Sequence, residues 1–75
     1  ASKLHVFSGD SSATAHVNAD DFTIESGGDA GLSILTGNTN NASIFFGDVE
    51  DNNIGMIDYD HNGNTMSLTA AASAN

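Results

Sequence analysis

The segment Asp58–Asn64 has the spacing in this chain that best suits metal chemistry. Oxygen donors recur there at alternate positions before a glycine, as in the first half of a helix-loop-helix calcium loop. The twelfth position of such a loop needs a bidentate carboxylate, but it is Thr69 here, and both flanks have strand patterns. The alternative is a hairpin, because Asn62-Gly63 between alternating runs favours a two-residue type I′ turn. We favour the turn, flanked by two solvated aspartates, and expect no metal site.

The other chemically capable side chains lack a spacing that would assemble a catalytic centre. Cysteine is absent and the three histidines fall in separate segments, although His5 and His16 could align across neighbouring strands or stack around a symmetry axis. The acidic run Asp48–Asp51 is a polar loop without a flanking apolar pocket, and the glycine-rich run Gly27–Gly31 has no lysine for phosphate. No serine lies in a Gly-x-Ser-x-Gly turn. We expect no enzyme, no cofactor and no catalytic residue.

The charge balance excludes two classes of partner. The chain has 75 residues, 10 acidic side chains and a single cation, Lys3, which gives a formal net charge of -9. Such a surface repels phosphate backbones and anionic lipids, so binding of nucleic acid is not expected.

No apolar run of 18 or more residues is present, and no basic stretch precedes an apolar one. We therefore expect neither membrane insertion nor a signal peptide.

The elements that would position these residues are short strands. Asn, Asp, Gly, Ser and Thr make up 40 of the 75 residues, and these residue types favour turns over helices. Between the turn clusters, apolar and polar residues alternate with the period of a half-buried strand. The predicted strands are Leu4–Phe7, Ala13–Val17, Phe22–Ser26, Leu32–Thr36, Ala42–Phe46, Ile54–Tyr59 and Met66–Ala70. The pattern predicts an all-β fold, a meander of short strands joined by Asn/Asp/Gly turns.

Two runs indicate that several copies assemble. Ile34-Leu35 and Ile44–Phe46 place large apolar groups on both faces of their strands. A chain this short cannot easily cover both faces by itself, whereas copies wrapped around one axis could. The alternatives are a small monomeric sandwich that buries these side chains and, with less support because no consensus recurs, a repeat protein.

A large part of the chain resembles a known class of viral protein. The most specific stretch is Ile-x-Phe-x-Asp at 44–48, followed by Ile57-x-Tyr59-Asp60-His61. Together with Phe22–Ser26, Ala30–Ile34 and Gly37, Asn64–Leu68 and the opening Lys3–Val6, it resembles a structural segment of tailed-phage tail fibres and tailspikes. In that family the segment usually lies just upstream of a self-cleaving C-terminal chaperone domain. The resemblance covers about residues 22–68.

The resemblance implies a homotrimer of intertwined β-rich chains, arranged as a β-prism or a triple-β-helix-like shaft or knob. Its location would be the virion surface or the extracellular space. The chaperone domain and its serine and lysine pair do not follow Leu68 here, and we expect either that this domain has been removed or that the chain belongs to a shorter fibrous assembly. We expect residues 1–75 to be one fibre module, with 69–75 as a linker or cut end.

The resulting hypothesis is a structural and attachment module of a phage fibre. The expected trimer core is Ile24, Ile34, Ile44, Phe46, Ile57 and Leu68. A host-surface glycan or protein would be contacted by Gly47–Asn53 and by the corner Tyr59–His61. A second hypothesis is the subunit of an extracellular filament or adhesin, with or without calcium, that assembles by strand addition. A third, a monomeric sugar-binding sandwich, has less support because the chain has no Trp and only one Tyr.

Overall fold

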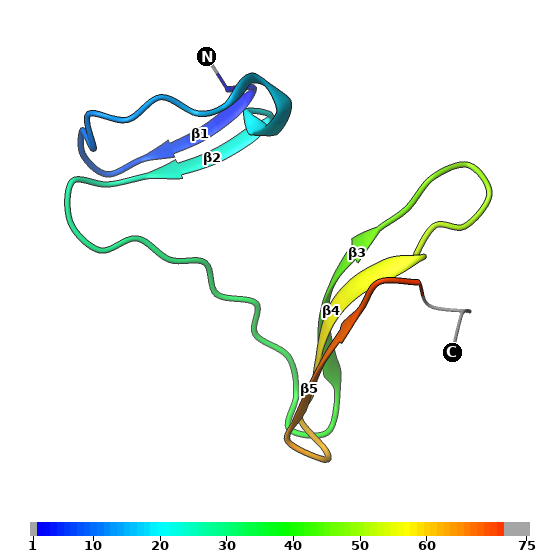
Figure 1. Ribbon diagram of the computed structural model, residues 1–75. Helices are drawn as coiled ribbons and strands as arrows, with labels where there is room; N and C mark the ends of the chain where they lie inside the picture. The colour runs from blue at the N-terminus through cyan, green and yellow to red at the C-terminus, as the bar shows by residue number, and fades with distance from the viewer. Residues whose placement is uncertain (1, 72–75) are drawn as a thin grey trace. The chain divides into compact units, whose positions relative to one another are not determined.

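Strands are the main regular elements of the chain, as the all-β prediction expects. The computed structural model describes residues 2–71 (Figure 1). Its elements in chain order are β1 (Leu4–Phe7), the 3-10 helix η1 (Val17–Ala19), β2 (Phe22–Glu25), β3 (Asn41–Phe46), β4 (Gly55–Asp60) and β5 (Thr65–Thr69). The strands form two separate sheets, β1-β2 and β3-β4-β5, in two compact units, Ala1–Ser33 and Ile34–Asn75. That the whole chain acts as one fibre module stays a prediction.

The first unit is a parallel pair of strands, not part of a meander. β1 and β2 run in register from Leu4 opposite Phe22 to Phe7 opposite Glu25. Parallel strands need a long crossover, and residues 8–21 provide it. The predicted strand Ala13–Val17 is wrong, since this part of the crossover is irregular and Val17 begins η1.

Local side-chain hydrogen bonds explain why the crossover does not form a strand. The Asp10 carboxylate accepts a hydrogen bond from the backbone N–H of Ser12, at 2.8 Å, and Ser12 has a φ of 66°, in the left-handed region. The Ser11 hydroxyl accepts another from the Ala13 N–H, at 3.1 Å. Such bonds offer the backbone an alternative to a ladder, so alternation in the sequence does not produce a strand here.

The second unit is an antiparallel meander, as predicted. β4 lies in the centre, with Ile57 opposite Ile44 of β3 and Leu68 of β5. The predicted two-residue type I′ turn at Asn62-Gly63 is wrong, because β4 and β5 are joined by the four residues 61–64. A type I′ turn needs positive φ at both central residues, whereas the left-handed residue here is Asn64, at 54°.

The register gives the second sheet one apolar and one mainly polar face. Residues directly opposite each other point to the same side, and successive rows alternate between the two sides. The side that we call the apolar face carries Ala42, Ile44, Phe46, Gly55, Ile57, Tyr59, Met66 and Leu68. The other side carries Asn41, Ser43, Asp58, Asp60, Thr65, Ser67 and Thr69, with Phe45 and Met56 at one end. Four of the six residues expected in a trimer core, Ile44, Phe46, Ile57 and Leu68, share this face, and their place in a trimer stays a prediction.

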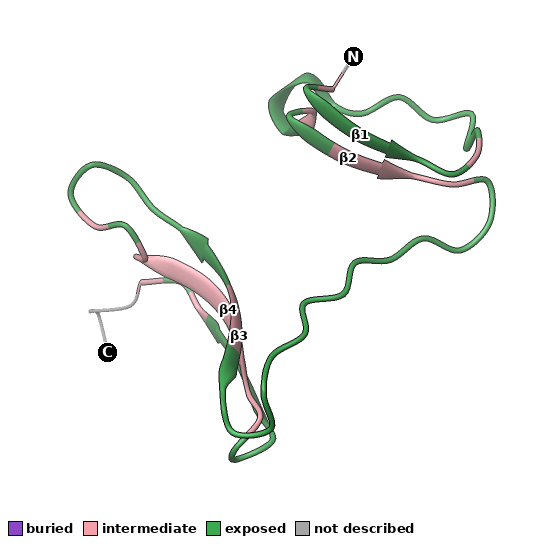
Figure 2. Cartoon of the chain, turned by 180° about the vertical axis from the view of Figure 1, so that it is seen from behind, coloured by how far each residue is buried: buried purple, intermediate pink, exposed green. Residues whose placement is uncertain are grey.

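Neither unit has a buried core of its own among residues 2–71 (Figure 2). β4 is half-buried along its whole length because it has a neighbour on each side, whereas the strands around it are more exposed. On the apolar face Ile44 is 39% exposed, Phe46 56%, Met66 62% and Leu68 75%. A small folded domain normally buries side chains of this kind, so these sheets lack a covering layer.

The segment between the two sheets differs from its prediction. The structure has no strand at Leu32–Thr36, which is extended and has no regular assignment; a turn at Gly37–Asn40 leads into β3. The predicted linker 69–75 begins later than expected, because Thr69 ends β5 opposite Met56. Residues 72–75 of that linker lie outside the described residues.

Candidate functional site

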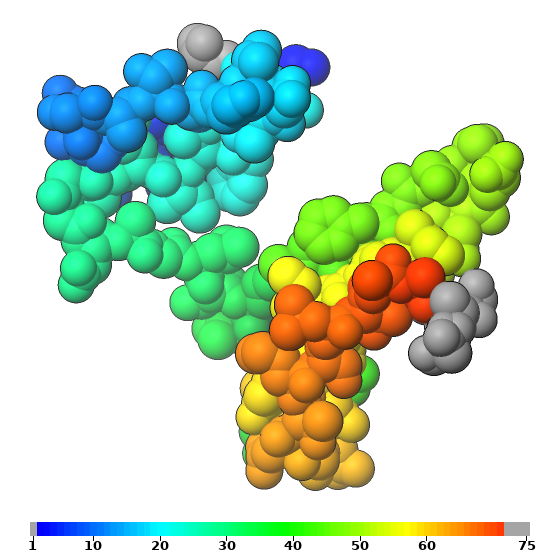
Figure 3. All heavy atoms as spheres, viewed as in Figure 1, coloured from blue at the N-terminus to red at the C-terminus, as the bar shows by residue number. Residues whose placement is uncertain are grey.

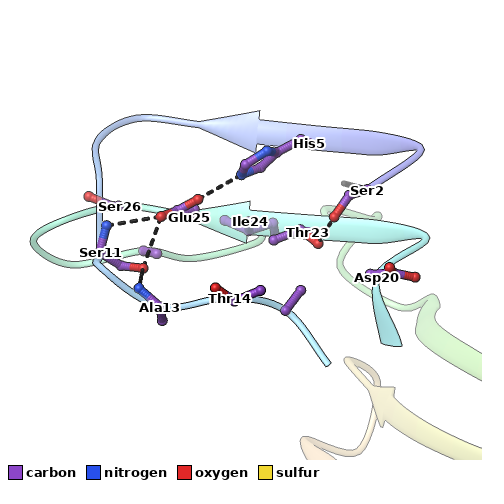
Figure 4. A pocket seen from close by; sticks show the side chains of 12 residues that line it. Ser2, His5, Ser11, Ala13, Thr14, Asp20, Thr23, Ile24, Glu25 and Ser26 are labelled. Carbon is purple, nitrogen blue, oxygen red and sulfur yellow. Dashed lines mark hydrogen bonds and ion pairs between the residues drawn. The ribbon is translucent and has the colours of Figure 1, made fainter. Parts of the chain in front are cut away.

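The densest polar cluster of the first unit centres on Glu25, the last residue of β2. One carboxylate oxygen, Oε1, lies 2.9 Å from Nε2 of His5 on β1. The other, Oε2, accepts hydrogen bonds from the backbone N–H and from the hydroxyl of Ser11, both at 2.9 Å. Figure 4 shows these contacts converging on the carboxylate. Glu25 therefore joins both strands and the crossover, and its side chain is only 14% exposed.

A cavity of about 380 Å³ lies beside this cluster (Figure 4). Its lining combines the Glu25 cluster with hydroxyls from Ser2, Thr14 and Thr23 and with the carboxylate of Asp20. Ser2 and Thr23 are hydrogen-bonded to each other through their hydroxyls. All of the lining residues belong to the first unit and come from both strands, from the crossover and from the residues that flank the strands.

The cluster has the residue types of a catalytic triad in a different order. In a serine nucleophile system the histidine lies between the hydroxyl and the acid, and takes the hydroxyl proton. Here the carboxylate of Glu25 lies between Ser11 and His5. The Ser11 hydroxyl donates to Glu25, and the imidazole makes its contact with the same carboxylate. The arrangement binds three segments together and does not place the imidazole on the serine.

The contacts of Glu25 predict an acid sensitivity of the first unit. Hydrogen bonds from the Ser11 backbone and hydroxyl, with a smaller contribution from His5, lower the pKa of the Glu25 carboxyl below 4.5. Because this pKa is lower in the folded than in the unfolded state, the Glu25 carboxylate stabilises the fold at pH values above its unfolded-state pKa. The stabilisation is lost as the pH falls through the folded-state pKa. We expect Glu25→Gln to be less stable than the wild type at pH 7 and to lack this acid-dependent loss. The protection of the Thr23–Ser26 amides against hydrogen exchange, measured as a function of pH, reports this loss.

Glu50 is the matched control, because it is the chain's other glutamate and lies in the exposed loop between β3 and β4. Glu50→Gln removes the same charge without touching the Ser11 and His5 contacts. If the two variants showed the same exchange profile against pH, the role given to the Glu25 contacts would be wrong.

The histidines do not come together as a pair. His5 contacts Glu25, whereas His16 caps η1 by accepting a hydrogen bond at Nδ1 from the Asn18 N–H, at 3.0 Å. His61 lies in the β4-β5 loop against the Tyr59 ring, with ring centroids 4.9 Å apart. Within residues 2–71 no three or more His, Cys, Asp or Glu side chains form a group that could hold a metal ion.

The aspartates of the calcium-like segment are engaged in structural hydrogen bonds. Asp58 accepts from the Asn41 amide at 3.0 Å and from the Ser43 hydroxyl at 2.5 Å, both on the neighbouring strand β3. Asp60 accepts from the backbone N–H groups of Asn62, at 2.9 Å, and Gly63, at 3.4 Å. One carboxylate thus fixes strand pairing and the other fixes the loop, whereas the sequence predicted two solvated residues; both aspartates are half-buried.

The predicted receptor loop Gly47–Asn53 is held by its own acidic residues. Asp48 donates its backbone N–H to the Asp51 carbonyl at 2.9 Å, and its side chain accepts from the Glu50 and Asp51 N–H groups at 3.0 Å. A Cβ at Gly47 would lie 2.4 Å from the Asn52 backbone, so only glycine fits this close approach. Val49 at the tip is 98% exposed.

The apolar face of the second unit is the other candidate site. It carries no charged side chain, although the chain has 10 acidic residues. Its four most exposed large side chains come from both outer strands, so the uncovered area extends across the sheet. A surface of this chemistry is suited to contact with another apolar surface and has no groups for acid-base or metal chemistry.

Sequence reasoning missed the Glu25 cluster. The pairing of β1 with β2 is parallel and spans 18 residues, from Leu4 to Phe22, and no short-range signal announces such a contact. The only hint is the alternation that places His5 and Glu25 on one side of their strands and Val6 and Ile24 on the other.

Two further findings concern membrane-spanning helices and similarity to known proteins. Among the described residues, no helix is long and apolar enough to cross a membrane. No family model matches the chain, and searches of curated proteins and of solved structures found no similar protein.

Proposed function

We propose that the chain is a structural module of a phage tail fibre that assembles as a homotrimer on the virion surface. The observation that carries the assembly is the uncovered apolar face of the β3-β4-β5 sheet, with Ile44, Phe46, Met66 and Leu68 each more than a third exposed. The resemblance of residues 22–68 to fibre segments supports the identity of the assembly.

The distribution of charge is compatible with other copies as the covering layer. A chain with a net charge of -9 repels its copies wherever acidic side chains approach each other. The apolar face has no acid, and Asp58 and Asp60 lie on the opposite side of the sheet. Copies that meet through the apolar face therefore keep these carboxylates in water.

The first unit supports the same proposal independently. Leu4, Val6, Phe22 and Ile24 share one side of the β1-β2 pair, and the first three are 58%, 47% and 47% exposed. A two-stranded sheet is marginally stable in water without a packed face. Assembly would supply that packing for both units, and the polar loops would stay exposed for contact with a host-surface glycan or protein.

A second candidate is an extracellular filament built by strand addition. The observation that favours it is the open edges of β3 and β5, which have no further strand beside them within residues 2–71. An open edge is a template for pairing with another chain. The two candidates differ in whether the assembly closes at three copies.

Solution mass distinguishes the candidates. We expect light scattering to give one species with three times the 7.7 kDa chain mass, unchanged by calcium or by a chelator. Open-ended polymers that grow with concentration, or an assembly lost with the chelator, would favour the filament. A stable single chain would contradict both.

A further inference from the structure

The extended segment Leu32–Thr36 has the features of a strand without a partner. Leu32, Ile34 and Leu35 are 59%, 43% and 89% exposed, and within the described residues no backbone hydrogen bond is made by residues 29–36. Backbone N–H and C=O groups need partners once water is excluded from them. An apolar, extended segment of this kind can satisfy these groups and cover its side chains by joining a sheet.

We propose that Leu32–Thr36 joins the edge of β5 in a neighbouring copy as an added strand. This inference rests on the proposed homotrimer and names the contact that builds it. Each copy donates one segment and accepts another, a head-to-tail contact that closes into a ring when the rotation between copies fits three.

Length and exposure favour β5 over β3 as the acceptor. β5 has five residues, as the segment does, whereas β3 has six; the apolar-Ser-apolar order of Leu32-Ser33-Ile34 recurs on both strands and suits either. The β5 side of the apolar face is the least covered, with Met66 and Leu68 62% and 75% exposed against 39% for Ile44 on β3. Figure 3 shows the orange and red atoms of β5 open at the surface.

Charge also allows the pairing. Residues 30–47 contain no charged side chain, and neither does β5, although 10 acids are spread through the rest of the chain. By contrast, β2 includes Glu25 and β1 follows Lys3. The donor and the acceptor can therefore approach without bringing like charges opposite each other, which would destabilise the pair.

The donor must come from another copy because the segment cannot reach β5 of its own chain. The sheet order β3-β4-β5 places a strand beyond β5 three strand spacings from β3, about 14 Å. The segment is joined to β3 through the turn Gly37–Asn40, which the Asn40 N–H closes on the Gly37 carbonyl at 3.1 Å. Such a turn spans less than about 7 Å.

Cysteine pairs test the contact directly, since the chain has no cysteine of its own. With Ile34 on the apolar side, Ser33 faces Ser67 when Ile34 pairs with Met66 in an antiparallel addition or with Leu68 in a parallel one, at a separation that a disulfide spans. One preparation of Ser33→Cys and one of Ser67→Cys are unfolded, mixed, refolded and mildly oxidised. We expect a linked 33–67 product, and with the double variant a ladder ending at three chains.

Ser43→Cys is the matched control, because Ser43 lies in the same row of the sheet as Ser67 but on the opposite edge strand, β3. We expect the 33–67 product to exceed the 33–43 product by about tenfold, since cross-strand neighbours meet disulfide geometry and remote positions do not. Equal yields, a preferred 33–43 product, or a double variant linked only within single chains would overturn the inference.

Amide exchange on the wild-type chain gives a second measurement that needs no substitution. We expect the amides of Leu32–Thr36 to exchange about a hundredfold more slowly than those of an unstructured peptide of the same sequence. Free exchange in a chain whose mass is that of a trimer would refute the strand donation and leave the trimer standing. A monomeric mass with free exchange would refute both.

Discussion

The variant Ile57→Asp is expected to abolish assembly. Ile57 lies at the centre of the apolar face, on the central strand and between Ile44 and Leu68. A trimer that covers this face would enclose one unpaired carboxylate per copy, at a cost of at least about 3 kcal/mol each. That is a loss of about a hundredfold or more in assembly for each copy. Light scattering at increasing concentration would then give the mass of one chain.

Val49→Asp is the control for this experiment, since it makes the same change from a β-branched apolar residue to aspartate. Val49 is 98% exposed at the tip of the β3-β4 loop, away from the sheet. We expect it to assemble as the wild type does. Normal assembly of Ile57→Asp, or equal loss in both variants, would contradict the role of the apolar face.

The second large effect is expected for Phe46→Ala when compared with Phe45→Ala. The two phenylalanines are neighbours on β3, and the single chain exposes them almost equally, at 56% and 55%. They point to opposite sides of the sheet, with Phe46 on the apolar face opposite Gly55 and Phe45 opposite Met56. The same truncation at both positions therefore compares the two faces.

In a monomer both truncations would have similar, small effects because both rings are half in water. If copies cover the apolar face, Phe46 becomes a core side chain, and its loss costs about 3–5 kcal/mol, as for other buried phenylalanines. For a chain of this size we then expect the midpoint of thermal unfolding to fall by about 10 °C or more for Phe46→Ala. We expect only a few degrees for Phe45→Ala. Equal shifts would mean that the apolar face stays uncovered.

The second unit was predictable from sequence because its contacts are local. β3, β4 and β5 follow each other in an antiparallel meander, so the apolar runs between turn clusters were enough to locate these strands, although Ile44–Phe46 does not alternate. Its loop was less predictable. Asn62-Gly63 favours a two-residue turn, but the Asp60 carboxylate accepts hydrogen bonds from the backbone N–H groups of both residues, and the loop between β4 and β5 has four residues.

The first unit was not predictable for the opposite reason. The pairing of β1 with β2 and the Glu25 cluster depend on contacts between residues 14 to 20 positions apart, for which the sequence has no periodic signal. The strand predicted at Ala13–Val17 is replaced by side-chain hydrogen bonds of Asp10, Ser11 and His16. Alternation shows which side of a segment is apolar but not which strand the segment joins, so the sequence could not predict that Leu32–Thr36 is unpaired.

If assembly completes the fold, thermal unfolding depends on the chain concentration. The thermal midpoint and the solution mass are measured together over a wide range of chain concentration. If the apolar faces are covered by other copies, mass action requires the midpoint to rise with concentration while the mass stays at three chains. A midpoint independent of concentration, with the mass of a single folded chain, would contradict the proposal that assembly completes the fold.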